Sequence, residues 1–129
     1  MVTVMISGNQ IVTANAGDSR ATIGSLKSSN YVMKDTKIES KALSMEDGNR
    51  IWHAKQVTRD HKPDDPDEQA RIEKQNGRIE SYKGRSGENV GPARVWLKTE
   101  NYPGLAMSRS LGDACAHSVG VSSDPGKYN

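Results

Sequence analysis

The sequence predicts a strand-rich α+β fold with too few elements to close two layers. Short runs of β-branched residues, separated by turn residues, occupy the first part of the chain, and one clear helix signal follows in the middle. The hydrophobic fraction is only 33% and there is no Phe, so the sequence can supply only a thin core. A net charge of +2 meets only half of the composition typical of disorder. The chain is therefore either a marginal domain or a piece of a larger one.

The first element is a predicted β-hairpin. Apolar residues alternate over 2–6, Gly8 and Asn9 interrupt the run, and residues 11–14 resume it. A further strand is predicted at 21–23. If the strands that complete the core lie outside the chain, these elements expose their apolar faces. The residues concerned are Val2, Val4, Ile6, Ile11 and Ile23.

Residues 24–50 are polar and mixed, which fits a long loop or an exposed hairpin inserted between core elements. Residues 80–101 form a second variable segment, in which only 94–97 alternate like a strand.

The helix signal covers residues 65–77. Asp65 is placed to cap the helix, Pro66 suits its first position, and Glu68 completes a capping box. Gly77 supplies the stop. The segment holds few apolar residues, so we expect a surface helix laid on a sheet.

Composition also bears on partners and location. There is no run of about 18 apolar residues and no signal-peptide pattern, so we expect no membrane association and a cytoplasmic or nuclear location. No window carries five or six consecutive bases, so we expect no nucleic-acid partner. Cys115 is the single cysteine and has no partner for an internal disulfide.

Asp18 is the first candidate for chemistry. It follows an apolar strand and Gly17, at a strand end where functional side chains gather. Two structural alternatives stay open: Asp18 caps the turn through backbone amides, or it pairs with Arg20 on the same side of an extended chain.

Arg109 and Asp113 form the second candidate pair, because a spacing of four on a helical turn allows an ion pair. Gly112 between them indicates a tight backbone. Two serines, Ser108 and Ser110, need a neighbouring base to act as nucleophiles. The sequence places none of the histidines beside them, namely His53, His61 and His117.

A cluster of carboxylates at 60–68 offers the oxygen ligands that Mg²⁺ and Ca²⁺ prefer. Acidic residues at a helix N-terminus also interact favourably with the helix dipole. Helix capping is the favoured interpretation, and a cation site is the alternative.

Several motifs occur in a familiar order. Residues 14–20 read ANAGDSR, residues 58–77 read TRDHKPDDPDEQARIEKQNG, residues 105–113 read LAMSRSLGD, and residues 120–125 read GVSSDP. Together they resemble the NxGDSR, DHKP, SRxxGD and GVxxxP blocks of metal-dependent serine/threonine protein phosphatases of type 2C. The resemblance spans nearly the whole chain, apart from 24–50 and 80–101.

This resemblance implies a β-sandwich flanked by helices that binds two Mg²⁺ or Mn²⁺ ions between its sheets. It also implies that a water held by the metals hydrolyses phosphoserine or phosphothreonine in protein substrates. Asp18 matches an aspartate implicated in a third, weaker metal site. The resemblance gives supporting roles to Ser19, Arg20, Arg109, Gly112 and Asp113.

The blocks that carry the family's main metal ligands and its phosphate-binding arginine do not occur within residues 1–129. We therefore expect a partial catalytic domain, an interior fragment with an incomplete sandwich, no catalytic residue of its own and no activity in isolation. The alternative is a catalytically dead, phosphatase-like interaction or regulatory module. The sequence does not indicate the oligomeric state.

Overall fold

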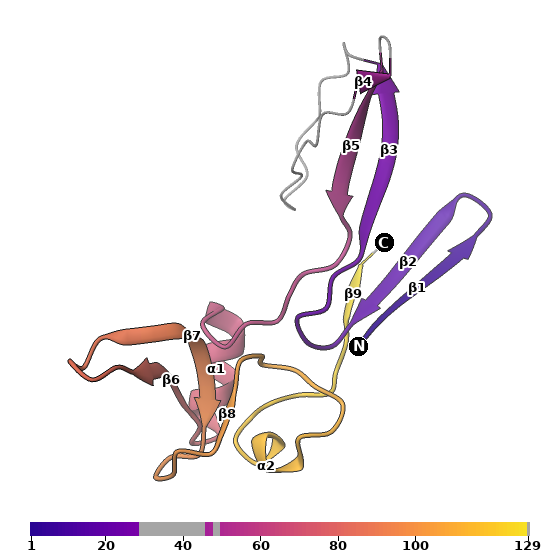
Figure 1. The fold of residues 1–129 in the computed structure, drawn as a ribbon. Coiled ribbons are helices and arrows are strands. Elements are labelled where there is room, and N and C mark those ends of the chain that lie inside the picture. The colour runs from indigo at the N-terminus through magenta and orange to yellow at the C-terminus, as the bar shows by residue number, and fades with distance from the viewer. Residues whose placement is uncertain (29–45, 48–49, 129) are drawn as a thin grey trace.

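A computed structural model describes residues 1–28, 46–47 and 50–128. Its strands form three antiparallel sheets of three strands each, accompanied by two short helices in these ranges. The sheets do not stack into a closed sandwich, and two long hairpins project from the middle of the molecule (Figure 1). The fold is an incomplete α+β arrangement, as the sequence predicts.

The first sheet contains the predicted hairpin. Strands β1 (Val2–Ser7) and β2 (Gln10–Asn15) pair in register, and β9 (Gly126–Tyr128) adds to the far side of β2. Gly8 has φ 55°, which suits a glycine at the first position of a two-residue hairpin turn. This sheet brings the end of β2 beside residues that lie more than a hundred positions later.

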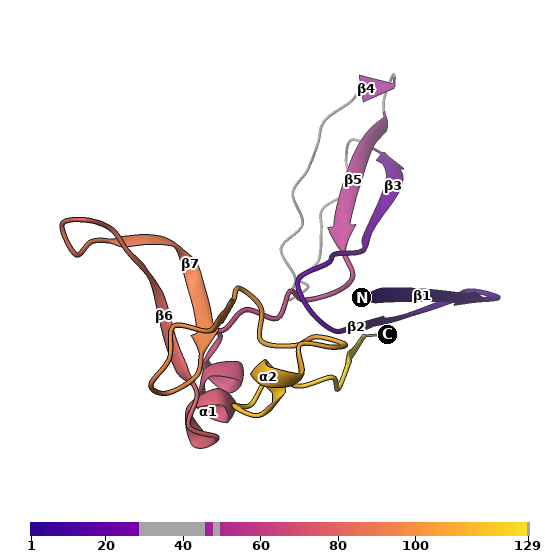
Figure 2. The ribbon, with the colours of Figure 1, turned by 60° about the horizontal axis from the view of Figure 1, so that its bottom comes forward.

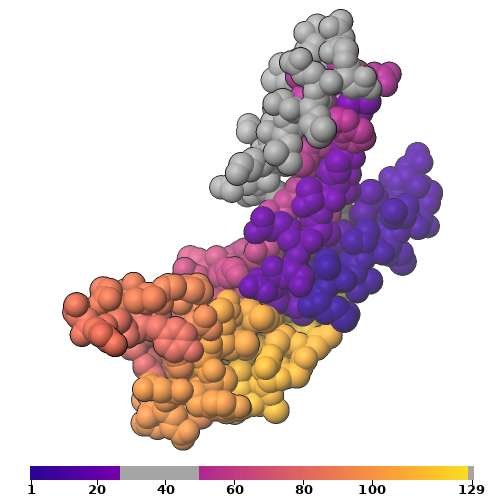
Figure 3. Space-filling view, in the orientation of Figure 1, coloured from indigo at the N-terminus to yellow at the C-terminus, as the bar shows by residue number. Residues whose placement is uncertain are grey.

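The apolar face of this hairpin is open. Val4 is 48% exposed and Ile6 is 71% exposed, while Val2, Ile11 and Ile23 are half-buried. None of the five residues expected to form exposed faces is fully buried. The space-filling view shows the hairpin on the outside of the molecule (Figure 3).

The second sheet pairs β3 (Thr22–Ser28) with β5 (Arg50–Gln56), and β4 (Glu46–Asp47) adds to β5. The segment expected to be a loop or hairpin at 24–50 thus begins inside β3. Its remaining part, 29–45 and 48–49, lies outside the described residues.

Helix α1 (Pro66–Lys74) occupies the segment with the helix signal, but its ends differ from the expected ones. Asp65 is extended and makes no side-chain cap, and Glu68 is buried instead of reaching back to it. At the other end, Asn76 takes the left-handed conformation with φ 62°. Gly77 is needed for space, because a Cβ there would lie 2.7 Å from the Val119 carbonyl oxygen.

The third sheet pairs β6 (Arg78–Lys83) with β7 (Asn89–Trp96) and β8 (Pro103–Leu105). Much of the segment expected to vary, 80–101, therefore belongs to regular strands. Trp96 packs edge-on against Tyr82 and donates from Nε1 to the Glu80 carbonyl at 2.8 Å.

The core lies where α1, this sheet and the segment around α2 (Ala114–His117) meet (Figure 2). It is small. Its buried members are Ile72, Val95, Ala116, Val119 and Val121, with Ile79, Leu97 and Leu105 packed against them.

Candidate functional site

The sequence motifs meet at one place in the fold, which we call the motif junction. It comprises residues 15–20, 58–68, 71, 107–113 and 120–124. His61 links two of its segments, because its N–H donates to the Gly17 carbonyl and its own carbonyl accepts from Ser108, both at 3.1 Å. Ser110 N–H donates to the Ser122 carbonyl at 3.0 Å. Four segments far apart in sequence are thus joined through their backbones.

Two buried side chains fix the loop that follows β2. Asn15 is fully buried, and its amide nitrogen donates to the Gly17 carbonyl at 3.0 Å and the Arg59 carbonyl at 2.9 Å. Gly17 N–H lies 3.3 Å from Nδ1 of His61, which is 2% exposed. Burial lowers the pKa of His61, and the Arg109 charge lowers it further. Nδ1 also lies 3.2 Å from the Gly17 carbonyl oxygen, so the ring tautomer decides whether Nδ1 accepts from the Gly17 N–H or donates to that carbonyl.

Gly17 itself has little space around it. Its φ is 110°, and a Cβ would lie 3.3 Å from the Arg109 carbonyl oxygen and 3.4 Å from the Met107 sulfur. A positive φ and a close backbone approach both favour glycine. The residue before Asp18 is thus held between three segments of the junction.

Asp18 lies at the edge of the junction. Its Oδ2 accepts from the Lys62 ammonium at 2.6 Å, and the two side chains are 34% and 38% exposed. Arg20, which the sequence offered as a partner for Asp18, forms a two-pronged pair with Asp60 at 3.1 and 2.8 Å. That pair lowers the pKa of Asp60. The structure therefore assigns Lys62, a residue the sequence analysis did not single out, to Asp18.

Asp18 fits a divalent cation as one carboxylate ligand. Mg²⁺ commonly keeps several waters and binds through one or two carboxylates, and Asp18 is open to water. The described residues contain no group of three or more His, Cys, Asp or Glu side chains suited to hold a metal. On their own they form no complete metal centre.

Glu68 holds the centre of the junction together. Its side chain is 1% exposed and accepts from Arg109 Nη2 at 2.5 Å, Arg71 Nη2 at 2.8 Å and Ser108 Oγ at 2.6 Å. Burial alone would raise the pKa of this carboxyl, but the bonds from Arg109, Arg71 and Ser108 outweigh burial and hold it well below its usual range. Glu68 is therefore an ionised structural anchor and not part of a capping box.

Arg109 and Asp113 do not share a helical turn, contrary to the sequence expectation. The Arg109 guanidinium binds Glu68 and donates to the Asp124 carbonyl at 2.8 Å. Asp113 stands at the start of α2 in the left-handed conformation, with φ 53°. Gly112 before it has φ 110°, so these two residues shape the turn into α2.

Arg71 joins α1 to the late segments. Its Nε donates to the Gly120 carbonyl and its Nη2 to the Ser108 carbonyl, both at 2.8 Å. One arginine thus satisfies carbonyls from two motifs while it also neutralises Glu68.

Two further carboxylates of the acidic segment bind one arginine. Arg59 lies 3.0 Å from both Asp65 and Asp67, and its hydrogen bond lowers the pKa of Asp67. Among the described residues, ion pairing therefore occupies four of the five carboxylates that the sequence offered either for capping or for a cation, and the fifth, Asp64, is exposed.

The two candidate serines differ in their surroundings. Ser108 is fully buried and its hydroxyl donates to Glu68. Ser110 Oγ lies 3.4 Å from His117 Nε2, a neighbour that sequence spacing did not reveal. Ser110 is 6% exposed, so its hydroxyl supports the turn rather than facing solvent. Ser19, by contrast, is exposed.

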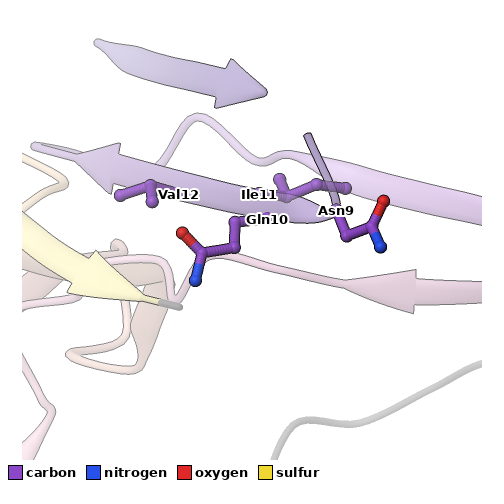
Figure 4. Close-up of a pocket in the computed structure, with 4 residues that line it drawn as sticks. All are labelled: Asn9, Gln10, Ile11 and Val12. Atoms are coloured by element: carbon purple, nitrogen blue, oxygen red, sulfur yellow. The ribbon is translucent and has the colours of Figure 1, made fainter. Parts of the chain in front are cut away.

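A separate hollow of about 310 Å³ lies against Asn9, Gln10, Ile11 and Val12 (Figure 4). It is at the turn end of the β1–β2 hairpin, the opposite end of β2 from Asp18. These four side chains carry no acid, base or nucleophile, so we place the candidate site at the junction.

The family follows from comparison with known proteins. The family model for protein phosphatase 2C matches residues 1–127. The chain belongs to the protein phosphatase 2C family. It is 42% identical over 118 residues to "Probable protein phosphatase 2C 61" of Arabidopsis thaliana, covering 92% of this chain and 29% of the relative. It is 39% identical over 106 residues to "Probable protein phosphatase 2C 12" of Oryza sativa subsp. japonica, covering 82% and 21%.

The chain thus spans less than a third of the length of these relatives. Neither helix of the described residues is long and apolar enough to cross a membrane.

Proposed function

We propose that this chain is part of the catalytic domain of a metal-dependent serine/threonine protein phosphatase and acts as the framework that positions Asp18. The observation that supports this most directly is the convergence of the family's motifs on the junction. Gly17, His61 and Ser108 come from three motifs and are joined by successive backbone hydrogen bonds. Each motif therefore holds the backbone of another in place at the junction.

Asp18 is the proposed metal ligand, for Mg²⁺ or Mn²⁺. When bound, such cations supply positive charge to phosphoryl oxygens and lower the pKa of water. The chain's own residues hold the Asp18 loop: Arg20 anchors it to Asp60, and Arg109 anchors the SRxxGD segment to Glu68. Ser19 follows Asp18 in the same loop, while Gly112 and Asp113 shape the turn beyond Arg109.

The proposed substrates are phosphoserine and phosphothreonine in proteins, and the proposed location is cytoplasmic or nuclear. We propose no nucleic-acid or membrane partner. The blocks that carry the family's main metal ligands do not occur within residues 1–129, so we propose that residues 1–129 alone do not turn over substrate.

A chimera tests the function. Residues 1–129 replace the matching segment of the Arabidopsis relative that is 42% identical, and hydrolysis of a phosphothreonine peptide is measured with Mn²⁺. We expect turnover by the chimera, reduced turnover by its Asp18→Asn variant, and none by residues 1–129 alone. A chimera that melts cooperatively at the relative's temperature but lacks activity would contradict the proposal.

The second candidate is a phosphatase-like interaction or regulatory module without catalysis. The contact that favours it is Lys62 on Asp18, because an ammonium already neutralises the carboxylate that a cation would use. A folded but inactive chimera would support this candidate.

A further inference from the structure

We propose that Lys62 is an exchangeable counter-ion that sets how tightly Asp18 takes a divalent cation. The inference rests on the proposed role of Asp18 and assigns a function to the lysine beside it. In the absence of a cation the ammonium neutralises the carboxylate, and a cation competes with it for that charge.

The backbone brings Asp18 and Lys62 side by side. Gly17 and His61 are joined twice, through Gly17 N–H to Nδ1 at 3.3 Å and His61 N–H to the Gly17 carbonyl at 3.1 Å. Asp18 and Lys62 are the next residues on the two segments, and they meet at 2.6 Å. Asp65 N–H also donates to the Lys62 carbonyl at 3.1 Å. Buried neighbours therefore fix both backbones, while the side chains remain partly exposed.

The choice of lysine sets this pair apart. Among the ion pairs of the described residues, Asp18 is paired with a lysine and the other carboxylates with arginines. Guanidinium is a planar fork that suits permanent two-pronged bonds, whereas ammonium is a strongly hydrated point charge on a flexible stem. Arginine therefore suits the framework, and lysine suits a contact that breaks and reforms.

Exposure allows the exchange. The side chains of Asp18 and Lys62 are 34% and 38% exposed, so water and ions reach the carboxylate and the displaced ammonium can move into solvent. The contact engages Oδ2 of Asp18. A cation that binds there competes with Lys62 for the same negative charge, which weakens its binding.

The test measures Mn²⁺ binding rather than turnover. Isotope-labelled residues 1–129 are titrated with Mn²⁺, and paramagnetic broadening of the Asp18 and Ser19 amide signals is followed against Ile11, which lies at the opposite end of β2. Lys62→Met removes the charge and keeps most of the stem. Lys62→Arg keeps the charge and adds the fork, and Asp18→Asn removes the ligand.

We expect Lys62→Met to lower the Mn²⁺ concentration for half-maximal broadening about two- to fivefold, the range for one exposed ion pair. Lys62→Arg should bind no more tightly than the wild-type chain, and Asp18→Asn should lose the site-specific broadening. If signal dispersion shows that Lys62→Met does not fold, Lys62→Gln takes its place with the same expectation.

Two contrary results are distinguishable. Unchanged or weaker binding by Lys62→Met, with loss of broadening in Asp18→Asn, overturns the role of Lys62 and leaves Asp18 as a ligand. Broadening that survives in Asp18→Asn, or is absent from the wild-type chain and the Lys62 variants alike, overturns the role of Asp18 and the inference with it.

Discussion

Replacing Glu68 by glutamine should destabilise the chain by about 3 kcal/mol, the lower end of the cost of breaking a buried ion pair. The carboxylate is 1% exposed and its partners Arg109 and Arg71 are 18% and 26% exposed. Glutamine keeps one acceptor oxygen but turns an NH₂ group toward donors, and it leaves two guanidinium groups without their shared negative charge. The partial exposure of both arginines is the reason for choosing the lower end.

Urea unfolding of the wild-type chain and of Glu68→Gln, followed by circular dichroism, measures this difference. Glu73→Gln is the matched control, because Glu73 is exposed on the same helix and its partner is Gln69 at 2.7 Å. The control should change the unfolding free energy by less than about 0.5 kcal/mol. A loss below about 1 kcal/mol in Glu68→Gln would show that Glu68 does not hold the junction together.

The same pair of proteins tests the ionisation of Glu68. Its pKa is lower in the folded chain than the usual value of 4.5, so its stabilisation is complete above about pH 4.5 and is lost as the pH falls through the folded value. The gap in unfolding free energy between wild type and Glu68→Gln should therefore be constant near neutral pH and narrow below about pH 4.5. A gap that stays the same down to pH 3 would show that the carboxylate is not selectively stabilised.

Two further predictions concern the loop before Asp18. The pKa of His61 is lowered on folding, so its contribution to stability is present above the usual value of 6.5 and is lost as the pH falls. The urea concentration at the unfolding midpoint of the wild-type chain should therefore drop from pH 7.5 to pH 5. The drop should be smaller in His61→Gln. Equal drops in both proteins would contradict this. Gly17→Ala should cost about 1–3 kcal/mol, because its φ is 110° and a Cβ would also lie 3.3 Å from the Arg109 carbonyl oxygen. Gly87→Ala, at a φ of 84° with open space around it, bears only the backbone cost and should lose less. Equal losses at the two glycines would argue against close packing at Gly17.

Local signals in the sequence were enough to predict the first hairpin and helix α1, but not most of the third sheet. The hairpin turn at Gly8 and the alternation on either side of it depend on residues within a few positions of one another, so the strands follow without tertiary information. Helix α1 is similar, since Pro66 and the acidic first turn act within one turn of helix. The motifs themselves were sufficient to predict the family.

Contacts between distant segments could not be predicted in this way. A glutamate three positions after an aspartate reads as a capping box, yet Glu68 is buried against Arg109 and Ser108, which lie about forty positions later. Lys62 was missed for the same reason, because its carboxylate partner is 44 positions away. The sequence shows which residues are charged, but the fold determines which oppositely charged residue each one contacts.

The small hydrophobic core is the reason that polar contacts must position the loops of the motif junction. Only five apolar residues form the buried core cluster of the described chain, so hydrophobic burial gives little that would fix the loops against one another. Non-directional burial would in any case leave loop positions loosely defined, whereas hydrogen bonds and paired charges fix distance and angle. Glu68 and Asn15 hold backbone and arginine groups in this directional way, and Asp18 lies at the margin of what they hold. A low hydrophobic content therefore accompanies a framework whose rigidity comes from buried polar contacts next to one exposed, exchangeable carboxylate.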